Sequence, residues 1–391
     1  MIYEIGNGAI MPILVTTATD LGASTGVAAF TLSLLGVGRV IGDVPSSWVA
    51  DRFGDRRSMM MAAAIAGLSF LACMLAPSLF VLDAALMILG MTSATFYLAR
   101  QSYLIEVAPL SLRARAQSTL AGSHRIGLFI GPFLGAAAIS LAGVRAPYVV
   151  AMATAVATAV LLFVVPDVDA QGQQQNESAR AVPGRRVLRE HLRLFLTLGI
   201  AVAAVGAIRQ AWPTVLPLWA HHIGLSPAKT SIVFGIANAV DMTLFYPSGK
   251  VMDRWGRLAV ALPAMIIMGA AMICLVFTRS IVELTIVAMT VAFGNGIGSG
   301  IVQTIGADAA PADGRRRFLS ILRLFADSGT GLGPLIVSLI AAIATLAAGI
   351  VAAGIVGLLA AAGLAAWVPR FTSYATPQAI RLHQQSREPA C

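Results

Sequence analysis

Nine charged residues interrupt long apolar stretches of this sequence, and these are the positions where chemistry is expected. They are Glu4, Arg39, Asp43, Arg100, Arg125, Arg209, Asp241, Arg323 and Asp327. One charge at the centre of a bilayer costs about 2.5–3.5 kcal/mol on insertion scales, so nine unpaired charges would cost on the order of 20 kcal/mol. This cost is too large for the charges to be incidental, so these side chains need partners or water within the membrane.

The stretches that hold these charges are long enough to span a membrane. The chain of 391 residues is 58% hydrophobic and 12% charged, whereas soluble domains carry about 25% charged residues. Met59–Phe80 and Leu335–Val368 hold no charge at all, and a span needs about 20 apolar residues. This pattern predicts an all-α membrane protein with 12 transmembrane helices. The predicted spans are 1–19, 24–47, 58–77, 82–106, 117–142, 146–166, 194–219, 227–249, 258–278, 282–307, 319–341 and 345–368.

These spans divide the chain into two bundles of six helices, residues 1–166 and 194–368. Residues 167–193 between them are polar and of low complexity, which is typical of a linker, and residues 369–391 form a polar tail. No cleavable signal peptide is expected, because the first apolar stretch lacks a basic region before it and has the length of a span.

Basic residues are distributed unevenly among the loops, and this predicts the orientation. Of 27 Lys and Arg, 19 fall in the loops after even-numbered spans or in the tail, three in the opposite loops and five within spans. Loops rich in Lys and Arg stay in the cytoplasm. We therefore expect a multi-pass protein of the bacterial inner membrane with both termini cytoplasmic. The net charge of +9 is then a topology signal and not a nucleic-acid surface.

The two halves align without a gap at an offset of 202 residues. Asp51-Arg52-Phe53-Gly54 matches Asp253-Arg254-Trp255-Gly256, and Gly131-Pro132 matches Gly333-Pro334. One register from residue 22 to residue 132 predicts two pseudo-symmetric bundles, with a binding site between them near the middle of the membrane. The same offset maps the start of the seventh span, near Arg193, to a point before Met1. The first helix is therefore expected to be shortened.

The loops after the second and eighth spans resemble the signature G-x-x-x-D-R-x-G-R-R of the major facilitator superfamily. The second copy begins at Gly249 and fits until Leu258, whereas the first copy has Ser47 and Asp55 where the first Gly and a basic residue are usual. The resemblance implies a twelve-helix transporter and a gating latch on the cytoplasmic side. The latch residues are Asp51, Arg52, Gly54, Arg56, Glu106, Gly249, Asp253, Arg254, Gly256, Arg257 and Asp308.

The latch has a physical rationale. Gly54 and Gly256 permit tight turns. Asp51 and Asp253 can face the N-terminal ends of the eleventh and fifth helices, where the helix dipole is positive. The basic residues that follow can pair with the acidic residue of the next basic loop, Glu106 or Asp308. The alternative is that these charges set the topology and have no gating role.

The fifth span resembles the antiporter motif G-x-x-x-G-P-x-x-G-G, with Gly127, Gly131, Pro132 and Gly135 in place and Ala136 at the end. The eleventh span carries a partial copy, Gly329-x-x-x-Gly333-Pro334, and the first span resembles the drug–proton antiporter pattern at Ile5-Gly6 and Pro12-Ile13. Together these motifs imply the drug-efflux branch, unless the glycines serve helix packing alone. One departure is clear. Leu86 and Leu89 occupy the Arg and Gln positions of R-x-x-Q-G, so the branch's usual proton-coupling residue cannot be carried over.

The repeat pairs charges of opposite sign. Arg39 corresponds to Asp241, and Arg125 corresponds to Asp327. In the resembled fold the second span lies beside the eleventh, and the fifth beside the eighth. We therefore expect two ion pairs between the halves, Arg39 with Asp327 and Arg125 with Asp241. Asp43 lies one turn from Arg39 and can share that arginine. The alternative is a static structural role.

The resembled fold lines its cavity with the first, fourth, seventh and tenth helices. The residues expected there to bind substrate or protons are Glu4, Arg100, Gln101, Arg209, Asn295 and Gln303. Glu4 is the first choice for the proton carrier, because a carboxyl in an apolar site can titrate near neutral pH. The alternative is a frayed terminal residue. Arg100 or Arg209 could instead bind an anionic substrate.

These features predict a secondary active transporter that moves a small molecule by alternating access, as a proton-coupled drug exporter. An importer or facilitator for an organic anion is the alternative within transport, and a transport-inactive membrane sensor or structural protein is the alternative of another class. No nucleophile constellation, phosphate loop or metal spacing occurs, so no enzyme, cofactor or metal is expected. The expected partners are a small-molecule substrate, protons and the lipid bilayer, with no nucleic acid, and the chain is expected to be monomeric.

Overall fold

A computed structural model describes residues 1–108, 112–164, 184–311, 315–372 and 374–378. Most of the predicted linker and tail lie outside these residues. Within the described residues the chain is helical and contains no strand. The predicted all-α membrane fold is confirmed.

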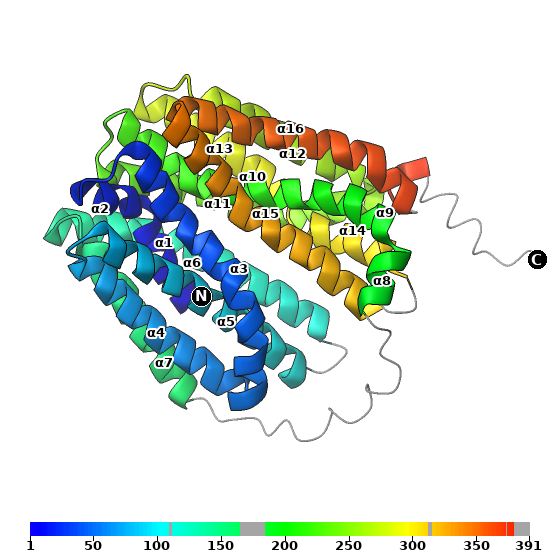
Figure 1. Ribbon diagram of the computed structural model, residues 1–391, viewed down its shortest axis with the longest axis horizontal. Coiled ribbons are helices and arrows are strands. Elements are labelled where there is room, and N and C mark those ends of the chain that lie inside the picture. The colour runs from blue at the N-terminus through cyan, green and yellow to red at the C-terminus, as the bar shows by residue number, and fades with distance from the viewer. Residues whose placement is uncertain (109–111, 165–183, 312–314, 373, 379–391) are drawn as a thin grey trace, which may run out of the picture.

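The helices form two bundles that lie side by side (Figure 1). The first bundle contains α1 (Ile2–Ile10), η1 (Met11–Ile13), α2 (Leu14–Asp20), α3 (Thr25–Phe53), α4 (Asp55–Leu75), α5 (Leu79–Val107), α6 (Arg113–Ala142) and α7 (Ala146–Val164). The second contains α8 (Gly184–Glu190), α9 (Leu192–Leu194), η2 (Phe195–Gly199), α10 (Ile200–His222), α11 (Pro227–Trp255), α12 (Leu258–Leu275), α13 (Ile281–Ile297), α14 (Ile301–Ala309), α15 (Arg315–Ile343) and α16 (Leu346–Phe371).

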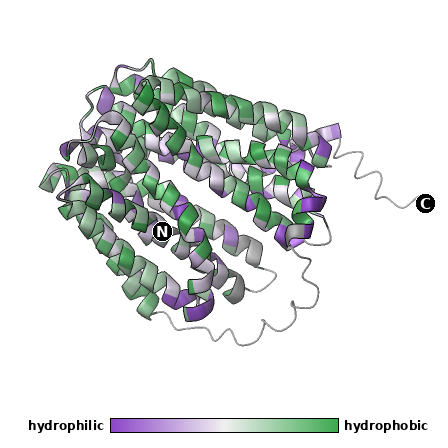
Figure 2. Ribbon diagram, viewed as in Figure 1, coloured by the Kyte–Doolittle hydropathy of each residue, from purple (hydrophilic) through white to green (hydrophobic). Residues whose placement is uncertain are grey.

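The lengths and composition of these helices suit a bilayer. In the described part of the chain, ten helices are long and apolar enough to cross a membrane. Hydrophobic residues cover the middle of the bundles, and hydrophilic residues gather at the helix ends (Figure 2). The two other predicted spans are the segment α1–α2, which a 3₁₀ turn at Pro12 interrupts, and α11. The count of twelve stays a prediction for these two segments.

The repeat of the sequence is visible in the element boundaries. The helices α3 and α11 are each 29 residues long and start 202 residues apart. Each begins at a serine N-cap, Ser24 or Ser226, whose hydroxyl accepts a hydrogen bond from the first turn. Each ends at a glycine with positive φ, Gly54 at 78° and Gly256 at 88°, a conformation that favours glycine. We call the end of the molecule with these two turns the basic end.

The two bundles meet along two seams, α3 against α15 and α6 against α11. At the end opposite the basic end, Thr19 Oγ1 lies 3.4 Å from His221 Nε2. These two residues are 202 positions apart, so they are equivalent in the repeat. Equivalent residues touch only beside the axis that relates the two halves, and this contact therefore marks the pseudo-twofold axis at that end.

Candidate functional site

Helix α1 packs tightly on α6 because small residues face each other there. A Cβ added at Gly127 would lie 2.5 Å from the Cβ of Glu4, and one at Gly131 would lie 2.5 Å from the carbonyl oxygen of Ile5. A Cβ at Gly135 would lie 2.8 Å from the carbonyl oxygen of Ala9. Glycine at four-residue spacing allows such backbone contact. The glycines of the antiporter motif therefore fix α1, and they hold Glu4 in the interior.

The second bundle uses the same contact. Added Cβ atoms at Gly329 and Gly333 would collide with the carbonyl oxygens of Ala203 and Ala207. In the repeat, Gly329 and Gly333 correspond to Gly127 and Gly131. Ala203 and Ala207 correspond to Met1 and Ile5. The partial motif in α15 therefore has the same packing role as the complete motif in α6.

Glu4 is fully buried and lies at the centre of a polar group that we call the Glu4 cluster. The cluster contains Glu4, Asn7, Arg39, Tyr97, Arg100 and His124. Glu4 Oε2 accepts a hydrogen bond of 2.7 Å from Tyr97 Oη, and Glu4 Oε1 lies 3.1 Å from His124 Nδ1 and 3.5 Å from Arg100 Nη1. The structure thus brings together Glu4 and Arg100, two of the predicted cavity residues. The alternative of a frayed end does not fit a carboxylate that is 0% exposed.

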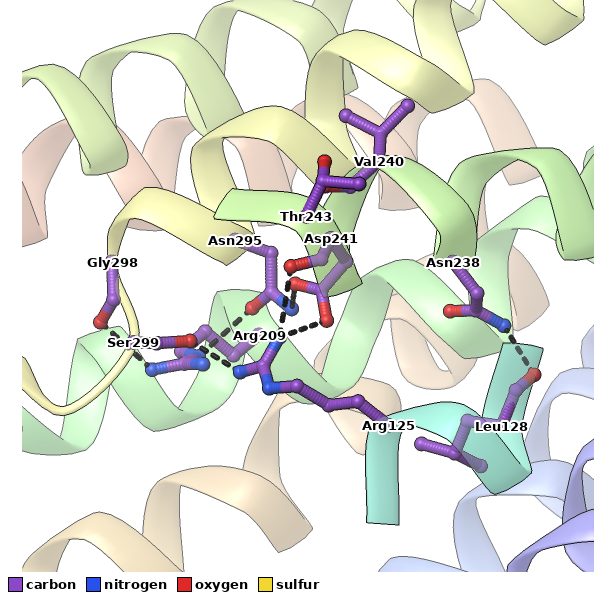
Figure 3. Close-up of polar contacts among 10 residues, drawn as sticks. All are labelled: Arg125, Leu128, Arg209, Asn238, Val240, Asp241, Thr243, Asn295, Gly298 and Ser299. Atoms are coloured by element: carbon purple, nitrogen blue, oxygen red, sulfur yellow. Dashed lines mark hydrogen bonds and ion pairs between the residues drawn. The ribbon is translucent and has the colours of Figure 1, made fainter. Parts of the chain in front are cut away.

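A second polar group, the Asp241 cluster, lies across the α6–α11 seam (Figure 3). It contains Arg125, Arg209, Asp241, Asn295, Gly298 and Ser299. Arg125 Nη1 forms an ion pair with Asp241 Oδ2 and also donates to the Asp241 carbonyl at 3.1 Å. Asn295 Nδ2 donates to Asp241 Oδ1 at 2.7 Å. Arg125 thus reaches from the first bundle to a carboxylate of the second.

Arg209 and a break in the tenth span complete this cluster. Arg209 Nε donates to Asn295 Oδ1 at 2.9 Å, and Arg209 Nη1 donates to the Gly298 carbonyl at 3.1 Å. The helix stops between α13 and α14, where Gly300 has a φ of 78°. Broken helices leave backbone carbonyls free to bind polar groups in a membrane interior. Here one such carbonyl accepts from Arg209, and the hydroxyl of Ser299 accepts from Arg125.

The two clusters are neighbours along the chain. His124, which faces Glu4, directly precedes Arg125, which faces Asp241. One turn of α6 therefore carries contacts to both clusters. The sequence reasoning did not single out His124, Tyr97 or Ser299. For His124, the available signal was its place three residues before Gly127, which puts it on the face of α6 that packs against α1.

The second expected pair between the halves is wrong. Asp327 Oδ2 lies 3.4 Å from Arg323 Nε on the same helix, and Arg39 forms no ion pair with it. Arg39 instead places its guanidinium carbon 5.2 Å from the centre of the Tyr97 ring. An arginine four residues away on the same helix needs no movement between bundles to reach the carboxylate. The α3–α15 seam is held by close backbone approach, with Gly36 near the Thr330 carbonyl.

The remaining predicted cavity residues do not join the clusters. Gln101 is half-buried and Gln303 is exposed, and neither makes a side-chain hydrogen bond within the described residues. Asp43 is half-buried and likewise makes no ion pair there. Thus Glu4, Arg100, Arg209 and Asn295 take part in the polar clusters, and the two glutamines do not.

The latch residues are placed unequally in the two halves. Arg257 Nε pairs with Asp308 Oδ2 at 2.7 Å, and its guanidinium lies over the ring of Tyr374. In the first half Arg56 donates to the carbonyls of Leu162 and Phe163, both at 2.7 Å. Asp51, Arg52 and Arg254 are exposed, and an added Cβ at Gly249 would meet nothing within 4 Å. The side chains of Glu106 and Asp253 lie outside the described part of the structure.

Two pseudo-symmetric helical bundles with buried charged clusters on their inner helices define a membrane transporter and not an enzyme. The chain belongs to the Major Facilitator Superfamily, whose family model matches residues 1–334. The superfamily inferred from the loop signatures is therefore confirmed.

Individual relatives differ in what their names say they carry. The chain is 32% identical over 129 residues to a gentisate transporter of Corynebacterium glutamicum, which covers 33% of this chain and 28% of that protein. It is 22% identical over 291 residues to the class B tetracycline resistance protein of Escherichia coli, covering 71% and 70%. A solved bacterial homologue of the lysosomal transporter Spinster, inward-facing and unoccupied, superposes with a TM-score of 0.75 at 16% identity over 95% of each chain.

Proposed function

We propose that this chain is a proton-coupled secondary transporter that works by alternating access, with Glu4 as the proton-carrying residue. The observation that carries the proposal is the burial of this carboxylate among Tyr97, Arg100 and His124, with no exposure to solvent. A buried carboxylate and its charged partners change their interactions strongly when a proton is added. Protonation of Glu4 removes its attraction for His124 and Arg100.

This change reaches the contact between the halves through α6. When Glu4 is neutral, the turn that contains His124 is less firmly held to α1. Arg125 lies in the same turn and pairs with Asp241 of the second half. The proton on Glu4 therefore biases the pairing between the halves, which is the two-state element that alternating access needs.

Two substrate classes remain candidates. Export of a drug is supported by the antiporter motif in α6 and by similarity to a tetracycline resistance protein. Transport of an organic anion is supported by similarity to a gentisate transporter and by charge, because the two clusters contain four arginines and two carboxylates. Binding without transport in proteoliposomes would instead favour a membrane sensor.

The latch and the orientation belong to the same proposal. The basic end faces the cytoplasm, as basic loops do, so a monomer in the bacterial inner membrane has both termini inside. The exposure of Asp51 and Arg52 supports a state that is open on this side. When the halves close there, Asp51 approaches the start of α15 and is stabilised by the helix dipole. The ion pair of Arg257 and Asp308 holds the second half's loop in shape throughout.

Glu4→Gln is expected to abolish proton-driven accumulation of substrate, because the amide cannot take up and release a proton. One proton per substrate across a one-unit pH gradient supports about tenfold accumulation. The wild-type protein should reach that ratio in proteoliposomes with an imposed pH gradient, and the variant should only equilibrate. The matched control is Glu283→Gln at the exposed start of α13, which should accumulate substrate normally. Unchanged accumulation and unchanged pH dependence in Glu4→Gln would exclude Glu4 as the proton carrier.

A further inference from the structure

Two arginines of the Glu4 cluster lie over one aromatic ring. The guanidinium carbon of Arg39 is 5.2 Å from the centre of the Tyr97 ring, and that of Arg100 is 4.9 Å from it. The arginines come from α3 and α5, so the packing of two helices brings them together. The ring face attracts cations. Tyr97 also donates to the buried carboxylate of Glu4, and the Arg100 guanidinium lies 3.5 Å from that carboxylate.

Both arginines keep hydrogen-bonding capacity that the described residues do not use. The Nε atoms of Arg39 and Arg100 are buried and have no hydrogen-bond partner there. Within the described part of the chain Arg39 also forms no ion pair. The charge of Asp327 acts on it, but that carboxylate pairs with Arg323 on its own helix. Buried donors of this kind cost free energy unless a partner satisfies them. Guanidinium groups offer planar pairs of N–H donors that match a carboxylate.

We propose that Arg39, Tyr97 and Arg100 form a subsite that binds the carboxylate of a small organic acid. The subsite rests on the proposed function, since it makes Glu4 and the substrate compete for the same arginine. Arg100 Nη1 now lies 3.5 Å from Glu4 Oε1. A substrate carboxylate that takes this guanidinium is repelled by an ionised Glu4 and is not repelled by a protonated one.

This competition determines whether a proton on Glu4 strengthens or weakens binding of the substrate. A proton on Glu4 strengthens binding of the anion, and by reciprocity the anion strengthens binding of the proton. Proton and anion therefore cross together, as in symport. A cationic substrate would compete with the proton and would be exchanged for it. The excess of arginines over carboxylates in the two clusters favours the anion.

Other charged and titratable groups face Glu4 and enter the test. They are Tyr3 on α1, Tyr97 and Arg100 on α5, and His124 on α6. Helix α7 faces this part of α1 with Ala151 and Thr154, which do not titrate. His124 Nδ1 lies 3.1 Å from Glu4 Oε1, so the test needs a His124 variant to separate its effect from that of Glu4.

Binding of radiolabelled benzoate to the purified full chain in nanodiscs tests the subsite. Measurements at about pH 5.5 and about pH 7.5 compare binding at proton concentrations about a hundredfold apart. The wild-type protein should bind more tightly at the lower pH. Arg39→Gln should weaken binding by at least about tenfold, the loss of one charge-assisted hydrogen bond. Arg39→Lys keeps the charge and should weaken it less, which separates a binding role from misfolding.

One control variant tests whether loss of binding is specific to the subsite, and two further variants test which group causes the pH dependence. Arg145→Gln, at an exposed site where the side chain donates to the Met74 carbonyl, should bind benzoate like the wild type. Glu4→Gln should bind equally well at both pH values, whereas His124→Gln should keep the pH dependence. Wild-type affinity in both folded Arg39 variants would overturn the subsite, as would absence of benzoate binding or displacement of benzoate by tetraphenylphosphonium and not by acetate. If only the Glu4→Gln result fails, the proton site is wrong and the anion subsite stands.

Discussion

Reversing both charges of the Arg125–Asp241 pair is expected to restore transport that either single reversal abolishes. Both side chains are largely buried, at 14% and 13% exposure. Removing one partner of a buried pair typically costs about 3–5 kcal/mol, because the other charge stays buried without a counter-charge. Arg125→Glu and Asp241→Arg should each reduce uptake by about a hundredfold or more if that cost falls on one of the two transport states. The double variant returns opposite charges to the seam and should recover a measurable part of the activity.

Uptake into proteoliposomes, measured on the two single variants and the double variant, gives the interaction energy as a double-mutant cycle. The matched control is the same swap at Arg186 and Glu190, an ion pair within α8 with 69% and 50% exposed side chains. Surface pairs of this kind contribute about 0.3–0.5 kcal/mol, so neither single nor double change there should affect uptake. If the Arg125–Asp241 double variant is as inactive as the worse single variant, this pair does not link the halves during transport.

The two seams differ in a way that bears on the mechanism. At α6–α11 the halves meet through an ion pair. At α3–α15 they meet through close backbone contact near Gly36, and the charges of Arg39 and Asp327 act on each other without forming an ion pair. Charged contacts can exchange partners with water, substrate or each other as the halves move. Close-packed backbone allows less change, because a small shift already loses its contacts. The α6–α11 seam, with His124 and Arg125 in one turn, is therefore the one on which the proposed proton of Glu4 would act.

The sequence was a good guide to the fold because its signals are local and repeated. Apolar length predicts spans, and the offset of 202 predicts equivalent helices, whose ends agree to the residue in α3 and α11. Paired glycines such as Gly127 and Gly131 indicate close helix contact before any coordinates are known. These features depend on residues near each other in the chain or on a strict register.

The arrangement of side chains was harder to predict, because it depends on competition between partners. Symmetry placed Arg39 opposite Asp327, but Arg323 is nearer to that carboxylate and Tyr97 offers Arg39 an aromatic face. The break after α13 was also missed. Gly298 and Gly300 flank Ser299 there, yet the apolar pattern continues through them, so hydropathy gives no sign of a stop. The repeat equivalent of Ser299 is Tyr97, and α5, which contains Tyr97, is an unbroken helix.

The same glycines lead to a second large effect, on stability. Gly131→Ala is expected to destabilise the protein strongly, since the new Cβ would lie 2.5 Å from the Ile5 carbonyl oxygen and 2.9 Å from the Ala9 nitrogen. Both are backbone atoms of α1 and cannot rotate away, so the helices must separate. Overpacking typically costs about 1–3 kcal/mol, and separation would also move Glu4 from its partners. A lower unfolding temperature in detergent and a loss of proton-driven uptake are the expected results.

Gly122→Ala on the same helix is the matched control, because an added Cβ there meets nothing within 4 Å. Replacing a helix-interior glycine by alanine without a clash stabilises by about 0.5–1 kcal/mol. The two variants should thus shift the unfolding temperature in opposite directions although they make the same chemical change. Gly333→Ala should behave like Gly131→Ala, since its Cβ would collide with the carbonyl of Ala207, the repeat equivalent of Ile5. Equal stability of the Gly131 and Gly122 variants would mean that α1 and α6 are further apart, and that Glu4 is not held in place by the antiporter motif.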